Sequence, residues 1–508
     1  MAPSRLPEML RGPLQEICLQ LRLAPLLQDM PLRAAFEKAL TPPPEAAVAA
    51  AITGLQRTAA LDEHEQLTPL GRHLAALPVD IGVGRLILYG SLFRCAQPIL
   101  LIAAALSDRS PFLSPMHKRD EARAVQSTFN VHQSDHLAVL EAHQRWEKEV
   151  KQNGKGAGYR FCERHFLSER TLQGMSDMAG QFWDNLVSLG MLPNLKALPY
   201  SERDQAREGA NRYSDNTELL KAVLCAGLFP NVVKATNPST NNSSSGGPFG
   251  SNKGGGLQLH QGRQSLSIHP SSFNRDQRRV DSGWLVYHEK VCVAQRRRRS
   301  LTSHTSHLSH SLLPLSKPQV ATGKIYIHDC SPVTALALFL FGAEPQVFHA
   351  QHRVVIDTWI DLRISPRTAV LFKALRKQLF ELLESKIANL PANAVQQMEE
   401  MAEGGGGGGG GAMSASPADV RSSASGDVRN EGKAVERPPE KKSVVVVGSK
   451  APVPGQAGWP PELESKEAAQ EAILTGLVYL IGKGMELQAD ELAAAALQGG
   501  KKPVPGRR

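Results

Sequence analysis

Two groups of side chains have the types and spacing of metal ligands. Asp62–Glu65 reads Asp-Glu-His-Glu, which resembles the carboxylate pair that holds Mg²⁺ in nucleotide-hydrolysing motors. Such a pair should end a buried apolar strand, whereas Asp62 follows the short stretch RTAAL, so we favour a solvated turn. His304, His307 and His310 are evenly spaced, but a metal site also needs a rigid element and groups that orient the ligands. We therefore predict no metal site.

Glycine-rich stretches could hold phosphate through backbone amides, but none has the required order. A phosphate-binding loop needs G-x-x-x-x-G-K-[ST], and Asn153–Gly158 and Ser251–Gly256 place their glycines and lysines differently. Gly82 and Gly84 would need a third glycine at position 87 for a dinucleotide site, where the chain has Ile87. The sequence also lacks H-E-x-x-H and G-x-S-x-G. We predict no catalytic residue and no cofactor-binding residue in this chain.

Length and charge bound the class of protein. The 508 residues are enough for about three domains, and the net charge of +9 favours a polyanionic partner without requiring one. The six cysteines form no C-x-x-C pair, so we expect reduced thiols in an intracellular protein. The first 20 residues lack the apolar segment of a secretory signal, and Pro98–Leu106 is too short to span a bilayer. We expect no membrane partner, and the sequence does not separate nucleus from cytoplasm.

Residues 1 to about 190 have the periodicity of helices. Pro44–Leu55 is amphipathic, the segment AALDEHEQLTPLG predicts two short strands around a charged turn, and Thr68 with Pro69 begins the next helix. This order of helix, hairpin and helix is that of a winged-helix unit, which we assign to residues 1–85.

A helical array is predicted for residues 86–190. In Ser168–Gly190, apolar residues recur at spacings of 3 and 4, Ser168 caps the start and Gly190 suits the residue after the end. This pattern is a packing stripe, and its methionine needs no cofactor to explain it.

The pattern changes to β after a polar linker at residues 191–216. Five short stretches bounded by turn residues predict strands: LCAGLFPNVVKAT, LQLHQGRQSLSIHP, WLVYHEKV, KIYIHD and RVVIDTWIDLRIS. With a helix at Val333–Phe341 between them, they indicate a small Greek-key barrel of the OB type over residues 217–390. Ser365 and Pro366 then begin an amphipathic helix that closes this domain.

Three segments are predicted to lie outside the packed domains. Residues 237–256 have the composition of a flexible loop, and residues 391–508 that of a mostly disordered tail with an isolated helix at 465–498. Cys292–Val320 separates two strands that would otherwise form a strand–turn–strand unit. We favour a translated intron or a lineage-specific insertion there; a basic localisation or RNA-binding patch at Arg296–Arg299 is the alternative.

Several long motifs, in order, resemble the region C-terminal to the motor in DEAH/RHA-type (DExH-box) ATP-dependent RNA helicases. They are MLRGPLQEICLQL, LTPLGRHLAALPVDIGVGRLILYGSLFRC, ILLIAAALSDRSPF, SDHLAVLEAHQRW, LLKAVLCAGLFPNV, LSIHPSSFN, WLVYHEKV and SPRTAVLFKALRKQL. The resemblance covers residues 5–390 apart from the insertions. It implies an α+β multidomain fold: a winged helix, a helical ratchet (HA2-like) bundle, an OB-fold β-barrel and a disordered glycine-rich C-terminal tail.

The resemblance also implies roles for particular residues. Gly71, Gly82 and Gly84 would serve tight turns and helix packing, and Arg72 would either contact a motor domain or cover a helix surface. The family's motor domains carry the phosphate loop, the DExH carboxylates and motif VI, and this sequence begins just past where motif VI would end. ATP and Mg²⁺ would then belong to the missing motor, and we expect no ATP hydrolysis by this chain alone.

The expected function is RNA binding that contributes to grip and unwinding by such a helicase. The partners would be single-stranded or structured RNA, helicase motor domains or activator proteins. A stand-alone RNA-binding protein or a scaffold for helicase partners, without enzymatic activity, is the alternative. RNA-contact candidates carried over from the family region are Lys118, Arg119, His269, Ser271, Ser272, Asn274 and Lys290. Serines and asparagines that make turns, and lysines that are merely solvated, are the competing interpretation.

Overall fold

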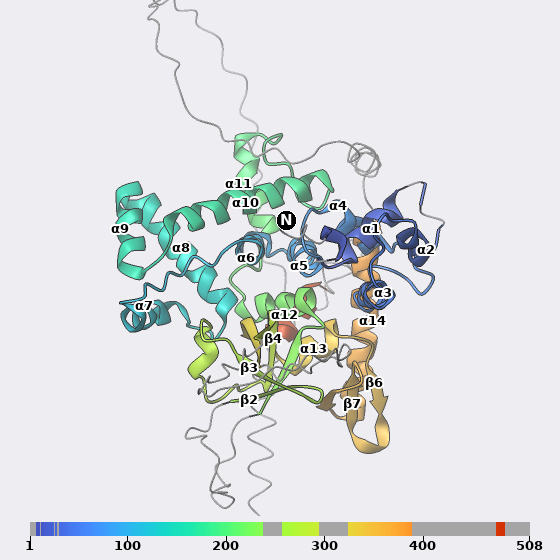
Figure 1. The fold of residues 1–508 in the computed structure, drawn as a ribbon. Coiled ribbons are helices and arrows are strands. Elements are labelled where there is room, and N and C mark those ends of the chain that lie inside the picture. Colours follow the sequence, from blue (N-terminus) through green and yellow to red (C-terminus); the bar gives the residue numbers. More distant parts are fainter. Residues whose placement is uncertain are drawn as a thin grey trace, which may run out of the picture.

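Most of the described helices lie on one side of a small β-barrel (Figure 1). The computed structural model describes residues 7–10, 12–24, 26–27, 30–236, 257–293, 324–388 and 474–482. The predicted loop at 237–256, the tail at 391–464 and the three spaced histidines lie outside these residues, as does the basic patch of the insertion.

The winged-helix unit begins with a 3-10 turn, Glu8–Leu10, and contains α1 (Gln15–Leu23), α2 (Leu32–Glu37), α3 (Glu45–Arg57) and α4 (Pro69–Ala76). Its predicted hairpin is reduced to one antiparallel bridge between Leu61 and Leu67. Thr68 caps α4 by accepting a hydrogen bond from the Gly71 amide at 3.0 Å. A Cβ on Gly71 would lie 2.0 Å from the Ala60 carbonyl oxygen, so this glycine serves helix packing, as predicted.

The acidic stretch Asp62–Glu65 forms the turn of that hairpin. The Asp62 carboxylate accepts hydrogen bonds from the amides of His64 and Gln66 at 2.8 and 2.7 Å. Glu65 pairs with Arg22 at 3.1 Å and accepts a hydrogen bond from the Leu32 amide. The carboxylates therefore stabilise a turn and join it to α1 and α2, which confirms the interpretation as a polar turn.

The helical array follows the winged-helix unit. Its members are α5 (Ile81–Leu92), α6 (Ala96–Ser107), α7 (Arg119–Gln126), a 3-10 turn at Ser127–Phe129, α8 (Asp135–Asn153), α9 (Lys155–His165) and α10 (Glu169–Ser188). The predicted stripe on α10 is buried, Ser168 caps its start and Gly190 adopts a φ of +70° after its end. Helical periodicity therefore predicted this part of the chain correctly.

Two further helices differ from the prediction. The linker at 191–216 contains α11 (Tyr200–Ala210), and the predicted strand LCAGLFPNVVKAT begins inside α12 (Thr217–Leu228). Every residue from Leu219 to Leu228 is buried, because α12 packs against α5 on one side and the barrel on the other. A helix that is apolar all round has the same short hydrophobic run as a buried strand.

The OB barrel is closed, with strand order β1-β2-β3-β5-β4. Its strands are β1 (Val232–Thr236), β2 (Gln258–Gln261), β3 (Gln264–Ile268), β4 (Trp284–Val293) and β5 (Lys324–Pro332), with a 3-10 turn, η3 (Phe273–Asp276), after β3. All pairs are antiparallel except β3 with β5. The register of β4 with β5 runs from Leu285↔Pro332 to Val293↔Lys324, so the strands on either side of the insertion pair as expected.

The remaining elements form a second, three-stranded sheet. After α13 (Ala335–Phe341) come the strands β6 (Gln346–Phe348), β7 (Arg353–Ile356) and β8 (Ile360–Arg363), and a 3-10 turn, His349–Gln351, precedes β7. Among the described strands, these three pair only with one another. The prediction that RVVIDTWIDLRIS belongs to the barrel is therefore wrong. The predicted amphipathic helix is α14 (Pro366–Ala388), and the residues 217–390 assigned to the OB domain contain more than the barrel.

The predicted C-terminal helix is described only for residues 474–482, and these are helical. They pack into the main hydrophobic core, so the expectation that this helix stands alone is wrong for its described part. Across the described chain, no individual helix combines the length and apolar character of a membrane span; α4 and α5 reach that threshold only jointly, as a pair bent by 110°.

Gly227 tests the packing of α12 against α5. A Cβ there would lie 2.8 Å from the Leu86 Cβ and 3.0 Å from its Cα, so Gly227→Ala should lower the free energy of unfolding by about 1–3 kcal/mol. Gly174→Ala on α10, where the added carbon meets nothing within 4 Å, should raise it by about 0.5–1 kcal/mol. Urea unfolding measures both; a loss of equal size in the two variants would contradict the close contact.

Candidate nucleic-acid interface

The junction between the helical array and the barrel centres on one buried carboxylate. Asp135 is the first residue of α8 and is 5% exposed. It accepts hydrogen bonds from the Ser272 hydroxyl at 2.6 Å and from the amides of Phe273 and Cys330, both at 2.9 Å. All three donors belong to the barrel, so this single side chain fixes the start of α8 on the barrel surface.

The neighbours of Asp135 extend the junction. The Ser134 hydroxyl and the His136 Nδ1 both lie within hydrogen-bond distance of the Ser331 hydroxyl, at 2.5 and 2.6 Å. Burial raises the pKa of Asp135 to about 6, although its three hydrogen-bond donors act in the opposite direction. Burial, and next the nearby His288, lowers the pKa of His136 to about 3, so His136 is neutral at pH 7.

Two of the predicted RNA-contact residues belong to this junction instead. Ser272 is 5% exposed, and its hydroxyl is bound to Asp135. Asn274 is 2% exposed, and its side-chain amide donates to the Cys330 carbonyl at 3.0 Å. Both side chains are therefore buried and hydrogen-bonded within the protein, against the prediction of RNA contact. Their acceptors come from distant parts of the chain, which the sequence pattern does not show.

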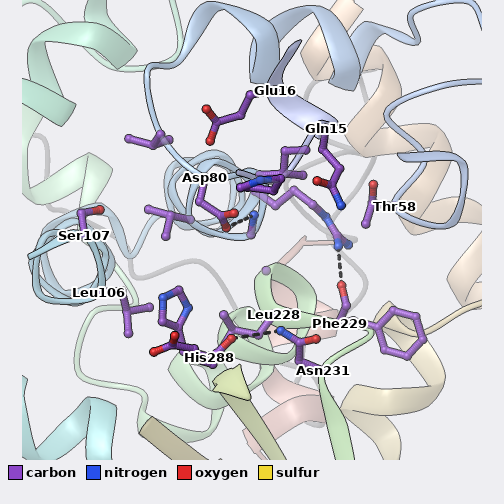
Figure 2. A pocket seen from close by; sticks show the side chains of 18 of the residues that line it. Gln15, Glu16, Thr58, Asp80, Leu106, Ser107, Leu228, Phe229, Asn231 and His288 are labelled. Atoms are coloured by element: carbon purple, nitrogen blue, oxygen red, sulfur yellow. Dashed lines mark hydrogen bonds between the residues drawn. The ribbon is translucent and has the colours of Figure 1, made fainter. Parts of the chain in front are cut away.

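A cleft of about 1030 Å³ opens where the winged helix, the helical array and the barrel meet (Figure 2). Gln15, Glu16 and Thr58 line it from the winged helix, Asp80 and Ser107 from the array, and His288 from the barrel. The buried Arg85 guanidinium donates to the Phe229 carbonyl at 2.8 Å, and Asn231 donates to the His288 carbonyl at 3.1 Å. These contacts hold α5, the α12–β1 connection and β4 around the cleft.

The cleft offers hydrogen-bonding groups of mixed charge. Glu16, Asp80 and Glu289 line it together with Arg57 and His288, and burial, then the nearby Asp80, raises the pKa of Glu16. A cavity of about 150 Å³ shares Leu106, His288 and Glu289 with the cleft and continues to Asp135 and Ser110. No cluster of three or more potential metal ligands occurs within the described residues. The lining of the cleft is therefore polar and of mixed charge.

Lys118 and Arg119 lie at the start of α7, with both side chains exposed. Lys118 is 3.8 Å from Glu121, and its ammonium lies 5.9 Å from the centre of the Phe166 ring. Further along α7, Arg123 pairs with Asp276 of η3 at 2.7 Å. Phe112, upstream of α7, packs edge-on against Phe273 of η3 at 4.9 Å between ring centres. These contacts bring the segment around α7 beside the barrel turn that follows β3.

His269 and Ser271 lie just before that turn. The His269 ring stacks on His328 of β5, with ring centres 3.7 Å apart, and Tyr326 meets it edge-on at 5.9 Å. Its Nδ1 is 2.7 Å from the hydroxyl of the exposed Ser271. Burial, and next the neighbouring His328, lowers the pKa of His269. The lowered pKa disfavours a positive charge on the His269 ring.

Lys290 stands apart from the other candidates. Its ammonium donates to the side-chain carbonyls of Gln261 and Gln264, at 3.1 and 3.2 Å, on the β2–β3 hairpin. Sequence reasoning also missed three exposed cations in NRDQRR, the segment from Asn274 to Arg279. They are Arg275, Arg278 and Arg279. The signal was visible as a basic run directly after the quoted motif LSIHPSSFN, and Asp276 within it contacts α7.

Comparisons with known proteins match four parts of the chain. Residues 51–79 match the winged-helix part of the helicase-associated domain HA2, and residues 80–139 match its ratchet-like part. Residues 220–344 match the oligonucleotide/oligosaccharide-binding (OB) fold, and residues 352–399 match the C-terminal domain in RNA helicases. The last match includes β7, β8 and α14, which lie outside the barrel.

Curated relatives match along most of the chain. It is 34% identical over 409 residues to the putative ATP-dependent RNA helicase DHX57 of Mus musculus. This alignment covers 76% of this chain and 27% of the relative. It is 35% identical over 387 residues to the ATP-dependent DNA/RNA helicase DHX36 of Mus musculus, covering 75% and 34%. For the chloroplastic ATP-dependent RNA helicase DExH4 of Arabidopsis thaliana, the identity is 33% over 407 residues, covering 76% and 26%. The chain spans between a quarter and about a third of the length of these relatives.

His136 gives the junction a defined pH dependence. Its pKa in the folded protein lies below the ordinary 6.5, so the folded state binds fewer protons and loses stability as the pH falls below 6.5. Between pH 7 and pH 5, the wild type should lose about 2 kcal/mol relative to His136→Gln, at 1.36 kcal/mol per pH unit.

Urea unfolding at several pH values measures this difference. Because Asp135 has a raised pKa and acts in the opposite direction, the comparison with the variant isolates the histidine. His117→Gln, on the exposed surface, should keep the wild-type profile. Parallel pH profiles for the wild type and His136→Gln would refute the assignment.

Proposed function

Since the chain belongs to the DEAH/RHA-type RNA helicases, of which it carries the winged-helix, ratchet-like and OB-fold C-terminal region, we propose that it grips single-stranded RNA where the array meets the barrel. The observation that carries this proposal is the Arg123–Asp276 ion pair, which joins α7 to η3. It brings exposed cations from two domains to one surface, the α7–η3 surface, whose residues are Lys118, Arg119, Arg275, Arg278 and Arg279.

Phosphate contacts provide affinity without sequence selection. Exposed lysines and arginines that neutralise phosphates release counterions, so their contribution to binding falls as salt increases. Arg279 pairs with Asp281 and Lys118 with Glu121, at 2.9 and 3.8 Å, so part of this charge is already compensated. The affinity of such a surface for RNA is moderate, which suits an RNA strand that must move along it.

The stacked histidines add a second kind of contact. Aromatic faces bind unpaired bases with little regard to sequence. Because the pKa of His269 is lowered, the His269–His328 pair can receive a base without carrying two charges. Ser271 beside it supplies a hydroxyl for sugar or phosphate oxygens.

We propose that ATP and Mg²⁺ act on motor domains with which this region works, since the sequence has no phosphate-binding loop. The purified 508-residue chain should therefore release no phosphate from ATP, with or without single-stranded RNA. A colorimetric phosphate assay at saturating ATP and Mg²⁺ measures this. RNA-stimulated turnover above the protein-free control would overturn the proposal.

The salt dependence of RNA binding tests the α7–η3 surface. Lys118→Gln/Arg119→Gln should reduce the slope of log Kd against log salt by about 1.4, at about 0.7 per single-strand phosphate contact. Fluorescence anisotropy with a labelled 12-nucleotide RNA, between 50 and 200 mM salt, gives the slope.

The matched control removes the same charge elsewhere. Lys148→Gln/Lys151→Gln, at the far end of α8, should keep the wild-type slope. In the same assay, His269→Ala should weaken binding at least about fivefold without changing the slope, whereas His269→Phe should retain affinity. Equal loss of slope in both lysine variants, or wild-type binding that ignores salt, would exclude this surface. A chain that binds helicase partners but no RNA would instead be a scaffold.

A further inference from the structure

Residues 474–482 are helical, and one face of this described stretch is fully buried. Leu474, Leu477, Val478 and Ile481 are each between 1% and 6% exposed, and their spacing of three, one and three residues places them on one side. These four side chains belong to the same hydrophobic core as the helical array. The other five residues of the helix are only partly buried.

The helix contacts the segment that connects α11 to α12. The Thr475 hydroxyl lies 3.1 Å from the Tyr213 hydroxyl. Gly482 lies beside Asn216, since a Cβ on this glycine would be 3.6 Å from the Asn216 side-chain nitrogen. Asn216 is also the cap of α12, and the Tyr213 amide donates to the Arg94 carbonyl after α5. The helix therefore lies beside the connection that leads into α12, and Figure 1 draws it in red near α12.

Chain connectivity does not impose this position. Residues 389–473 separate α14 from the helix, and a stretch of this length could extend by as much as about 280 Å. Its place must therefore come from the contacts it makes.

We propose that residues 474–482 are an intramolecular ligand, bound in an apolar helix-binding groove at the α11–α12 connection. The groove takes an amphipathic helix with apolar residues at positions 1, 4, 5 and 8, a common mode of helix recognition. The occupant is this chain's own segment, tethered at a high effective concentration. This inference does not depend on the proposed binding of RNA.

A peptide competition in the full chain tests the groove. The probe is a fluorescein-labelled peptide with the sequence of residues 470–486, and Leu477→Asp in the full chain should release the tethered helix. The variant should then bind the peptide at least tenfold more tightly than the wild type, whose groove is occupied. Leu480→Asp, the same change on the partly buried side of the helix, should behave like the wild type. A peptide carrying Leu477→Asp should bind neither chain.

A second experiment leaves the helix unchanged. A protease site placed within Gly404–Gly411 allows the folded chain to be cut between α14 and the helix. The C-terminal fragment should co-elute with the rest at micromolar concentration and separate when it carries Leu477→Asp. Separation of the unmodified fragment would overturn the proposal. So would a wild-type dimer that Leu477→Asp converts to a monomer, because the helix would then occupy the groove of a second copy.

Discussion

The orientation of the helical array on the barrel depends on one buried carboxylate, that of Asp135. Asp135 cannot remain in the apolar junction unless hydrogen-bond donors replace its hydration, and all three donors come from the barrel. Its position at the first turn of α8 adds the favourable end of the helix dipole. The interaction therefore favours the observed orientation of the array on the barrel.

The candidate interface follows from that orientation. With α8 fixed, α7 reaches η3 through Arg123 and Asp276, and the small cavity at Asp135 and His136 continues into the main cleft through His288. Arg85 provides a second fixed point, since its buried guanidinium binds the Phe229 carbonyl between α12 and β1. The cleft is thus bounded by domains whose relative positions are set by buried polar contacts rather than by loops.

Local patterns predicted those parts of the structure whose cause is local. The stripe on α10 and the Thr68 cap follow from spacing and backbone chemistry, and the structure contains them. The packing role of Gly71 was implied by the family resemblance, and the structure contains it as well. Local sequence patterns gave wrong predictions where tertiary contacts determine the structure. The apolar run of α12 has no polar face because it is buried on every side, and Ser272 looked like a surface turn residue because Asp135 lies 137 positions away. The cations of NRDQRR were visible in the sequence, but their proximity to α7 was not.

The composition of the interface bears on how a strand could move through it. A continuous row of unpaired cations would hold phosphates strongly and resist displacement. Here acidic groups line the cleft, and Asp276 and Asp281 pair with neighbouring arginines. Burial, and next the neighbouring His328, lowers the pKa of His269. Each contact with the proposed RNA is then weak and replaceable by the next nucleotide. The array and the barrel would move together, because breaking the buried hydrogen bonds of Asp135 costs free energy. Movement of one domain would then shift the whole proposed RNA-binding surface.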